Sequence, residues 1–131
     1  MTRRSAAGRT DDSAFVASDP KLVSRLEKLL EGRPDVVPRT MFGGVCFTLN
    51  GNVCLGVYKD QLIVRSGERQ ARGLLTRTHV RPMDITGKPM KGWIMVAPAG
   101  IASKRVLEGY VDAALEFVSA LPAKRSRLAA R

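Results

Sequence analysis

The fold of this chain is decided by residues 39–65, which read RTMFGGVCFTLNGNVCLGVYKDQLIVR. Alternating apolar residues and two turn signals predict a β-meander of three antiparallel strands, entered through a bend at Gly43-Gly44. Asn50-Gly51 marks the turn between the first two strands, and Lys59-Asp60 marks the turn before the third. We therefore expect the rest of the chain to pack around this sheet.

The register of the meander follows from the side-chain period of two. With a two-residue first loop, Phe47 would face Cys54, and the apolar residues of the first two strands would fall on opposite faces. We therefore expect a three-residue loop, Asn50 to Asn52. One face then holds eight apolar side chains, which are Val45, Phe47, Leu49, Val53, Leu55, Val57, Leu62 and Val64. The other face holds a mixed set that suits solvent or a partner: Cys46, Thr48, Cys54, Gly56, Tyr58, Ile63 and Arg65.

The two cysteines share the mixed face in this register but are diagonally offset. Such neighbours lie roughly 7 Å apart, whereas a disulfide prefers roughly 4 Å between its β-carbons. We expect Cys46 and Cys54 to be free thiols that fill space, with a redox role as the alternative. With His79 as the only histidine, their spacing matches no zinc site, and we expect neither a metal nor a cofactor.

Helices are predicted on both sides of the meander. Before it, Ser18 or Asp19 can cap a helix that Gly32 and Pro34 end, with an apolar stripe of Leu22, Val23, Leu26, Leu29 and Leu30. The last helix begins after a Ser103 cap and stops at Pro122. Its apolar face is broad and comprises Val106, Leu107, Tyr110, Val111, Ala114, Leu115, Phe117, Val118 and Leu121.

The segment between the meander and the last helix is less regular. Ser66 can cap a short helix through residues 71–75 with its arginines outward. Residues 78–83 read as an edge strand, 84–92 as a loop, and 93–97 as another strand. We therefore predict an α+β fold of order α-β-β-β-α-β-β-α, a two-layer antiparallel sheet of about five strands with the N-terminal and the long C-terminal helix on one face.

Composition predicts one soluble domain, residues 18–122, between a disordered arm (1–17) and a basic tail (123–131). At 131 residues with 44% hydrophobic side chains, the chain can bury a core without disulfides or metals. No apolar run approaches the roughly 20 residues that a membrane helix needs. The apolar piece at residues 14–17 is too short for a signal peptide. We expect a cytoplasmic protein without a membrane partner.

The net charge of +10 is concentrated in two places. One is the tail, with Lys124, Arg125, Arg127 and Arg131. The other is residues 59–91, whose acids are Asp60, Glu68 and Asp84. A basic field of this kind attracts polyanions at low salt, and an ordinary solvated surface is the alternative. Eight side chains are the candidate nucleic-acid contacts: Lys59, Arg65, Arg69, Arg72, Arg77, Arg81, Lys88 and Lys91.

A family resemblance rests on short motifs spread from about Asp19 to Lys124. The motifs are Arg39-Thr40-Met41-Phe42-Gly43-Gly44, Phe47, Asn50-Gly51, Leu55-Gly56-Val57, Val64-Arg65, Pro82-Met83, Thr86-Gly87-Lys88-Pro89-Met90-Lys91-Gly92-Trp93 and Leu121-Pro122-Ala123-Lys124. Together they resemble the N-terminal domain of the TfoX (Sxy) family, here in a stand-alone form. The resemblance implies a small α+β domain of the secretion-chaperone-like type. In the best-known members this domain belongs to regulators of natural competence, which promote transcription of DNA-uptake genes.

Three functions remain open, and we assign no catalytic residues. The first is a non-enzymatic regulatory or interaction domain with a protein partner. Its candidate surface comprises Arg39, Met41, Phe42, Gly43, Gly44, Lys88, Met90, Lys91 and Trp93, with core packing as the alternative for Phe42, Met90 and Trp93. The second is direct nucleic-acid binding through residues 59–91. The third and weakest is ligand binding or an enzyme centred on the MFGG bend and the 84–92 loop. The oligomeric state is open, a dimer included.

Overall fold

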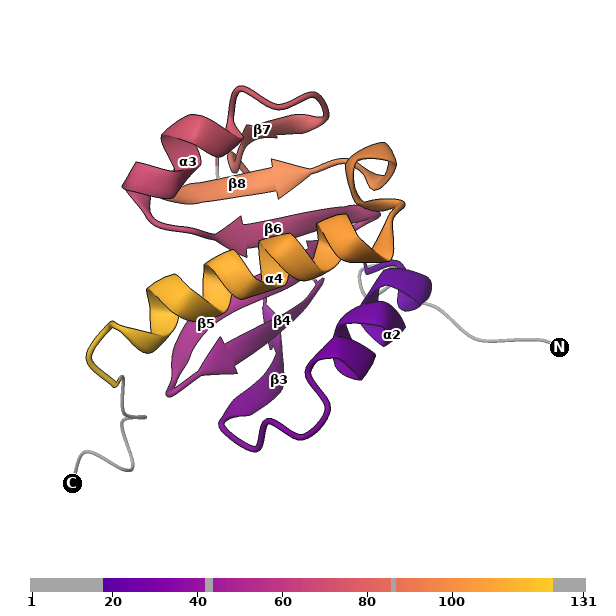
Figure 1. The fold of residues 1–131 in the computed structure, drawn as a ribbon, viewed down its shortest axis with the longest axis vertical. Helices are drawn as coiled ribbons and strands as arrows, with labels where there is room; N and C mark the ends of the chain where they lie inside the picture. Colours follow the sequence, from indigo (N-terminus) through magenta and orange to yellow (C-terminus); the bar gives the residue numbers. More distant parts are fainter. Residues whose placement is uncertain (1–17, 42–43, 86, 124–131) are drawn as a thin grey trace, which may run out of the picture.

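The computed structural model describes residues 18–41, 44–85 and 87–123 (Figure 1). The predicted arm 1–17 and all of the predicted basic tail beyond Ala123 lie outside the described residues. The elements are α2 (Pro20–Leu29), β3 (Val36–Met41), β4 (Gly44–Leu49), β5 (Asn52–Tyr58), β6 (Gln61–Arg65), α3 (Glu68–Leu74), β7 (Val80–Pro82), β8 (Trp93–Val96), the 3-10 helix η1 (Pro98–Ile101) and α4 (Lys104–Ser119).

The predicted α+β class is confirmed. Among the described residues, six strands form one antiparallel sheet in the order β3-β4-β5-β6-β8-β7. Helices α2 and α4 lie on the same face of this sheet, and α3 packs beside β8 (Figure 1). In the part of the chain that the structure describes, no helix is long and apolar enough to cross a membrane.

The sheet has one strand more than the sequence predicts, because β3 was missed. Pro38 lies inside β3 and argues against a strand, since it has no N–H to donate. The strand forms because it is an edge strand, paired only with β4 among the described residues. The amide of Asn50 donates to the carbonyl of Asp35, so by alternation the nitrogen of Pro38 faces away from β4. The other edge strand, β7, ends in Pro82, and both edges are therefore poor templates for a further strand.

The predicted three-residue loop between β4 and β5 is wrong. The loop holds two residues, Asn50 and Gly51, with φ angles of 54° and 85°. Both values are in the left-handed region that a tight hairpin turn requires, which the Asn-Gly pair adopts easily. A β-bulge then shifts the register, so that Thr48 pairs with Val53 but Phe47 pairs with Leu55.

Because of the bulge, two side chains lie on the face of the sheet opposite to the one predicted. Cys54 is the extra residue, and it turns toward the helices, where it is 0% exposed in the main core. Val53 pairs with Thr48 and is half-buried on the opposite face. The other predicted assignments of the apolar face hold. Its buried members are Phe47, Leu49, Leu55, Val57, Leu62 and Val64, and Val45 packs at its margin.

The two long helices begin at the predicted caps, but α2 ends at Leu29 and α4 ends at Ser119, before the predicted stops at Gly32 and Pro122. Asp19 caps α2 by accepting a hydrogen bond from the amide of Lys21, and Ser103 caps α4 by accepting from the amide of Val106. Their inward faces join the main core through Leu22, Leu26, Leu30, Leu107, Tyr110, Val111, Ala114 and Val118. The exposed side of α4 includes Val106, which the sequence had placed on the apolar face.

The predicted Ser66 cap of α3 is wrong. Gly67 occupies the N-cap position with φ +85°, and the buried hydroxyl of Ser66 donates to the carbonyl of Gly67. A β-carbon on Gly67 would lie 2.6 Å from ring atoms of Phe117 on α4. Glycine is therefore required here both for its backbone conformation and for the close approach of α4.

A second, smaller core lies on the face of the sheet away from α2 and α4. Ile63, Met83 and Met95 are buried there, with Tyr58, Ile85, Met90 and Trp93 packed against them. Met83, Ile85 and Met90 all belong to the segment that links β7 to β8. The face that the sequence left open to solvent or a partner is therefore partly covered by the protein's own loop.

Candidate interaction surface

The loop before β8 is fastened to its surroundings by main-chain hydrogen bonds. The carbonyl of Gly92 accepts from the amides of Ser66 and Gly67, both at 3.0 Å. The amide of Met90 donates to the carbonyl of Met83, also at 3.0 Å. A β-carbon on Gly92 would lie 3.2 Å from the amide nitrogen of Glu68. The loop and the start of α3 therefore form one fixed unit.

Trp93, at the end of this loop, is part of an aromatic and cationic stack. The guanidinium of Arg65 lies 5.1 Å from the centre of the Trp93 ring and 5.9 Å from that of Phe117. Arg65 also donates to the carbonyl of Val53. These contacts join β6, β8 and α4, and they engage the half-buried Arg65 within the domain.

The candidate residues of the GKPMKGW motif therefore divide by role. Met90 and Trp93 are half-buried and pack against the second core, as the packing alternative predicts. Lys88 and Lys91 are exposed. The apolar members hold the loop in place, and the lysines remain available to a partner.

The MFGG end of the candidate surface is built around a close approach of main chains. Gly44 is buried, and a β-carbon there would lie 2.4 Å from the carbonyl oxygen of Val57 on β5. The hydroxyl of Ser18 accepts from the amide of Val45 and donates to the carbonyl of Val57. Phe42 and Gly43 lie outside the described residues. For Met41 the structure establishes its main-chain pairing with Gly44.

Arg39 is exposed on β3, far from the lysines of the 84–92 loop. Three strands separate β3 from β8 in the sheet order. At about 4.8 Å per strand spacing, β3 and β8 are about 19 Å apart across the sheet. The predicted surface is therefore divided between two ends of the sheet and is not one patch.

A shallow depression lies on the sheet between these two ends. It is lined by Val45, Cys46, Val53, Gly56, Val57, Tyr58, Ile63, Met83 and Trp93. Its volume is about 10 Å³, which is room for about one water molecule. This depression does not accommodate a metabolite. Within the described residues, no three His, Cys, Asp or Glu side chains form a group that could hold a metal ion.

Half of the eight candidate nucleic-acid contacts are engaged within the domain. Besides Arg65, Arg77 lies over the Tyr110 ring and Lys59 over the Tyr58 ring, each at 5.5 Å. Arg81 forms an ion pair with Asp84 at 3.0 Å.

The other four candidates are each exposed and form no ion pair with any described residue. They are Arg69, Arg72, Lys88 and Lys91. We call these four residues the basic end. Arg69 and Arg72 are three residues apart on α3, so they extend from neighbouring points of one helix face. The bonds of Gly92 place Lys91 next to the start of α3. Glu68 also lies in this first turn, and the group remains net positive.

A family model described as the TfoX N-terminal domain matches residues 28–118. The chain belongs to this family. The match runs from α2 to α4 and so includes the whole sheet and both motif regions. No curated protein and no solved structure gives a significant match.

Some of the contacts that stabilise this TfoX N-terminal domain could not be predicted from its sequence. Ser18 was recognised only as a helix cap, but its hydroxyl joins β4 to β5. The hydrogen bonds between Gly92 and the start of α3 have no local sequence signal, because the residues that they join are 25 or more positions apart. The stack around Arg65 was missed for the same reason.

The two cysteines of this TfoX N-terminal domain are free and buried, as predicted for thiols that fill space. The bulge places them on opposite faces of the sheet, which excludes a disulfide more strongly than the predicted diagonal offset. The thiol of Cys54 donates to the carbonyl of Phe47. Burial raises the pKa of Cys46, and burial raises the pKa of Cys54 to about 11.

Titration of Cys54 should make the domain less stable at high pH. Its pKa rises from 9.0 in the unfolded chain to about 11 in the fold. The folded state therefore keeps a proton that the unfolded state loses, and stability falls from pH 9 through pH 11 by up to about 3 kcal/mol. Urea unfolding at pH 8, 9, 10 and 11 should show a steeper loss for wild type than for Cys54→Ala. Parallel losses in the two proteins would contradict this assignment.

Proposed function

We propose that the chain is a cytoplasmic, non-enzymatic regulatory domain that binds an acidic surface of a partner protein through its basic end. The observation that carries the proposal is the division of the basic segment. Lys59, Arg65, Arg77 and Arg81 each contact an aromatic ring or a carboxylate within the domain, whereas the four exposed residues of the basic end form no ion pair with a described residue. Membership of a family whose best-known members regulate competence genes supports a regulatory role.

The fixed loop suits the basic end to recognition. Hydrogen bonds of Met90 and Gly92 anchor the main chain on both sides of Lys91. A partner then has little backbone freedom to remove, which reduces the entropic cost of binding. Exposed charges of one sign also accelerate the encounter with an oppositely charged surface and help to select the partner.

Removing two charges from the basic end should weaken partner binding roughly tenfold, since each exposed charge contributes up to about 1 kcal/mol. The test variant is Arg69→Gln with Lys91→Gln. The matched control is Lys21→Gln with Arg105→Gln, which removes the same charge from exposed positions on α2 and α4. Tagged proteins would be recovered from cells, the bound protein identified, and its affinity for each purified variant measured by calorimetry.

The control variant should retain wild-type affinity. Equal affinities of wild type and the test variant would exclude the basic end as the binding surface. Equal weakening by both variants would show that the loss of affinity comes from the change in net charge and is not specific to the basic end. Recovery of no protein above background would count against a protein partner altogether.

Direct nucleic-acid binding is the second candidate function, favoured by the neighbouring arginines on α3. A duplex DNA of mixed sequence would bind with a log affinity that falls linearly with log salt concentration. The Arg69→Gln, Lys91→Gln variant should then reduce this slope by about 1.8, which is about 0.9 for each lost contact. Binding that disappears on deletion of residues 123–131 would assign it to the tail and exclude the basic end.

A further inference from the structure

Helices α2 and α4 lie on one face of the sheet (Figure 1), and residues of both helices line a groove. It comprises two hollows of about 310 and 370 Å³ that share Leu29 as a lining residue. Its apolar lining residues are Leu29, Leu107, Val111 and Leu115. Leu107 and Val111 are buried, whereas Leu29 and Leu115 are half-buried and leave apolar surface in the groove.

The two ends of this groove carry opposite charges. Arg25, Lys28 and Lys104 line one end. Glu108 and Asp112 line the other end. The guanidinium of Arg25 donates to the carbonyl of Ile101 at 2.7 Å, which holds its charge beside Lys28 and Lys104 in the groove. Lys104 and Asp112 are eight residues apart on α4, so about 12 Å separates the two ends.

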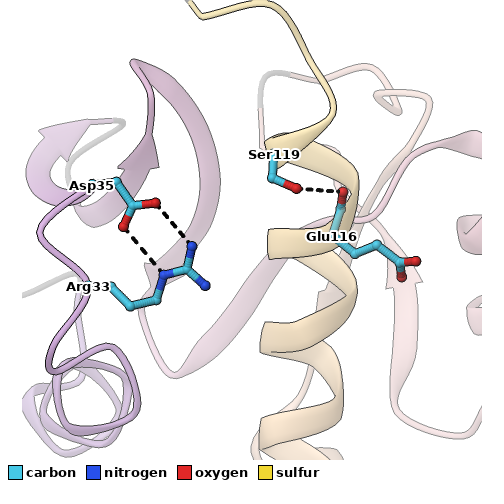
Figure 2. Close-up of polar contacts among 4 residues, drawn as sticks. All are labelled: Arg33, Asp35, Glu116 and Ser119. Atoms are coloured by element: carbon cyan, nitrogen blue, oxygen red, sulfur yellow. Dashed lines mark hydrogen bonds and ion pairs between the residues drawn. The ribbon is translucent and has the colours of Figure 1, made fainter.

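Arg33 also lines the acidic end, but its charge is compensated locally. Figure 2 shows its guanidinium turned to the carboxylate of Asp35, with a closest distance of 3.0 Å. This hydrogen bond lowers the pKa of Asp35 and raises that of Arg33, so the pair stays ionised and neutral overall. Glu108 and Asp112 therefore keep their excess of negative charge.

We propose that the face formed by α2 and α4 around this groove pairs with the same face of a second copy of the chain. In a two-fold dimer each surface meets itself reversed, so the positively charged groove end of one copy faces the negatively charged groove end of the other, twice. The half-buried Leu29 and Leu115 then lie in the middle part of the interface. A uniformly acidic partner is a poorer fit, because Glu108 and Asp112 repel it.

This dimer is independent of the function proposed above. Arg69 and Arg72 lie on α3, which packs beside β8 and is not part of the groove. The prolines at both sheet edges also disfavour association by strand addition, which leaves the helical face for pairing. The dimer presents two basic ends to its surroundings.

Charge-reversal variants test the pairing directly. Variant A carries Lys28→Glu and Lys104→Glu, and its groove is acidic at both ends. Variant B carries Glu108→Lys and Asp112→Lys, and its groove is basic at both ends. We expect wild type to dimerise in sedimentation equilibrium, and each variant alone to dimerise at least tenfold more weakly. An equimolar mixture of A and B should form a heterodimer with an affinity within about threefold of wild type, because opposite charges again meet at both ends.

The outcomes separate cleanly. All four positions are at the surface or the groove, and thermal unfolding of each variant checks that the fold is retained. Wild type that stays monomeric up to about 1 mM would overturn the proposal. Variants A and B that each dimerise as tightly as wild type would place the dimer interface elsewhere, and a mixture that remains monomeric would also overturn it.

Discussion

Replacing Leu55 with aspartate is expected to abolish the cooperative unfolding transition of the domain. Leu55 is 0% exposed and lies at the centre of the sheet, paired with Phe47 on one side and Val64 on the other. Loss of a buried leucine costs about 2–5 kcal/mol. A carboxylate buried there without a partner costs several kcal/mol more. The sum approaches the whole stability of a domain of this size, which is about 5–15 kcal/mol.

Urea denaturation followed by circular dichroism measures the effect. The matched control is Val37→Asp on the edge strand β3, where the side chain is 44% exposed. This variant should change the free energy of unfolding by less than about 0.5 kcal/mol. A Leu55→Asp protein with a cooperative transition and a loss below about 2 kcal/mol would show that the core tolerates charge at this position.

Replacing Gly44 with alanine should destabilise the domain by about 1–3 kcal/mol, because the new β-carbon overlaps the main chain of β5. It would lie 2.4 Å from the carbonyl oxygen of Val57 and 3.0 Å from the hydroxyl of Ser18. Neither neighbour can move freely, since the Ser18 hydroxyl itself bonds to Val57 and Val45. The same substitution at Gly109, within α4, meets no atom within 4 Å.

Gly109→Ala should therefore stabilise the domain by about 0.5–1 kcal/mol, since alanine loses less conformational entropy in a helix. The pair of variants makes the same chemical change with opposite expected signs. Thermal and urea unfolding of both proteins decide the outcome. Destabilisation of both would point to a general effect of the substitution. A neutral Gly44→Ala would show that β4 and β5 separate at no cost.

The family motifs of this TfoX N-terminal domain mostly serve the fold. In the GKPMKGW stretch, Met90 and Trp93 pack on the second core, and the carbonyl of Gly92 accepts the hydrogen bonds from the start of α3. In the MFGG stretch, Gly44 permits the close approach of β5. The two lysines of the first motif are the members that these contacts leave exposed. Motif residues therefore identify the family more directly than they identify a binding site.

The candidate site was predictable only in part. The 84–92 loop and its exposed lysines follow from glycine, proline and charge, which are properties of single residues. The separation of Arg39 from that loop depends on the order of strands in the sheet, which no local pattern encodes. The sequence could not show which basic residues have a partner within the domain, because that depends on the positions of Tyr110, Trp93 and Asp84.

Local patterns were sufficient for the α+β class, the meander, the two capped helices and most of the apolar face, because periodicity, caps and turns act over a few neighbouring residues. They failed for β3, where the edge position tolerates Pro38, and for the bulge that turns Cys54 into the core. The α2–α4 groove and the basic end also emerge only in the fold. Each depends on residues distant in sequence, and their contacts are decided when helices and strands pack together.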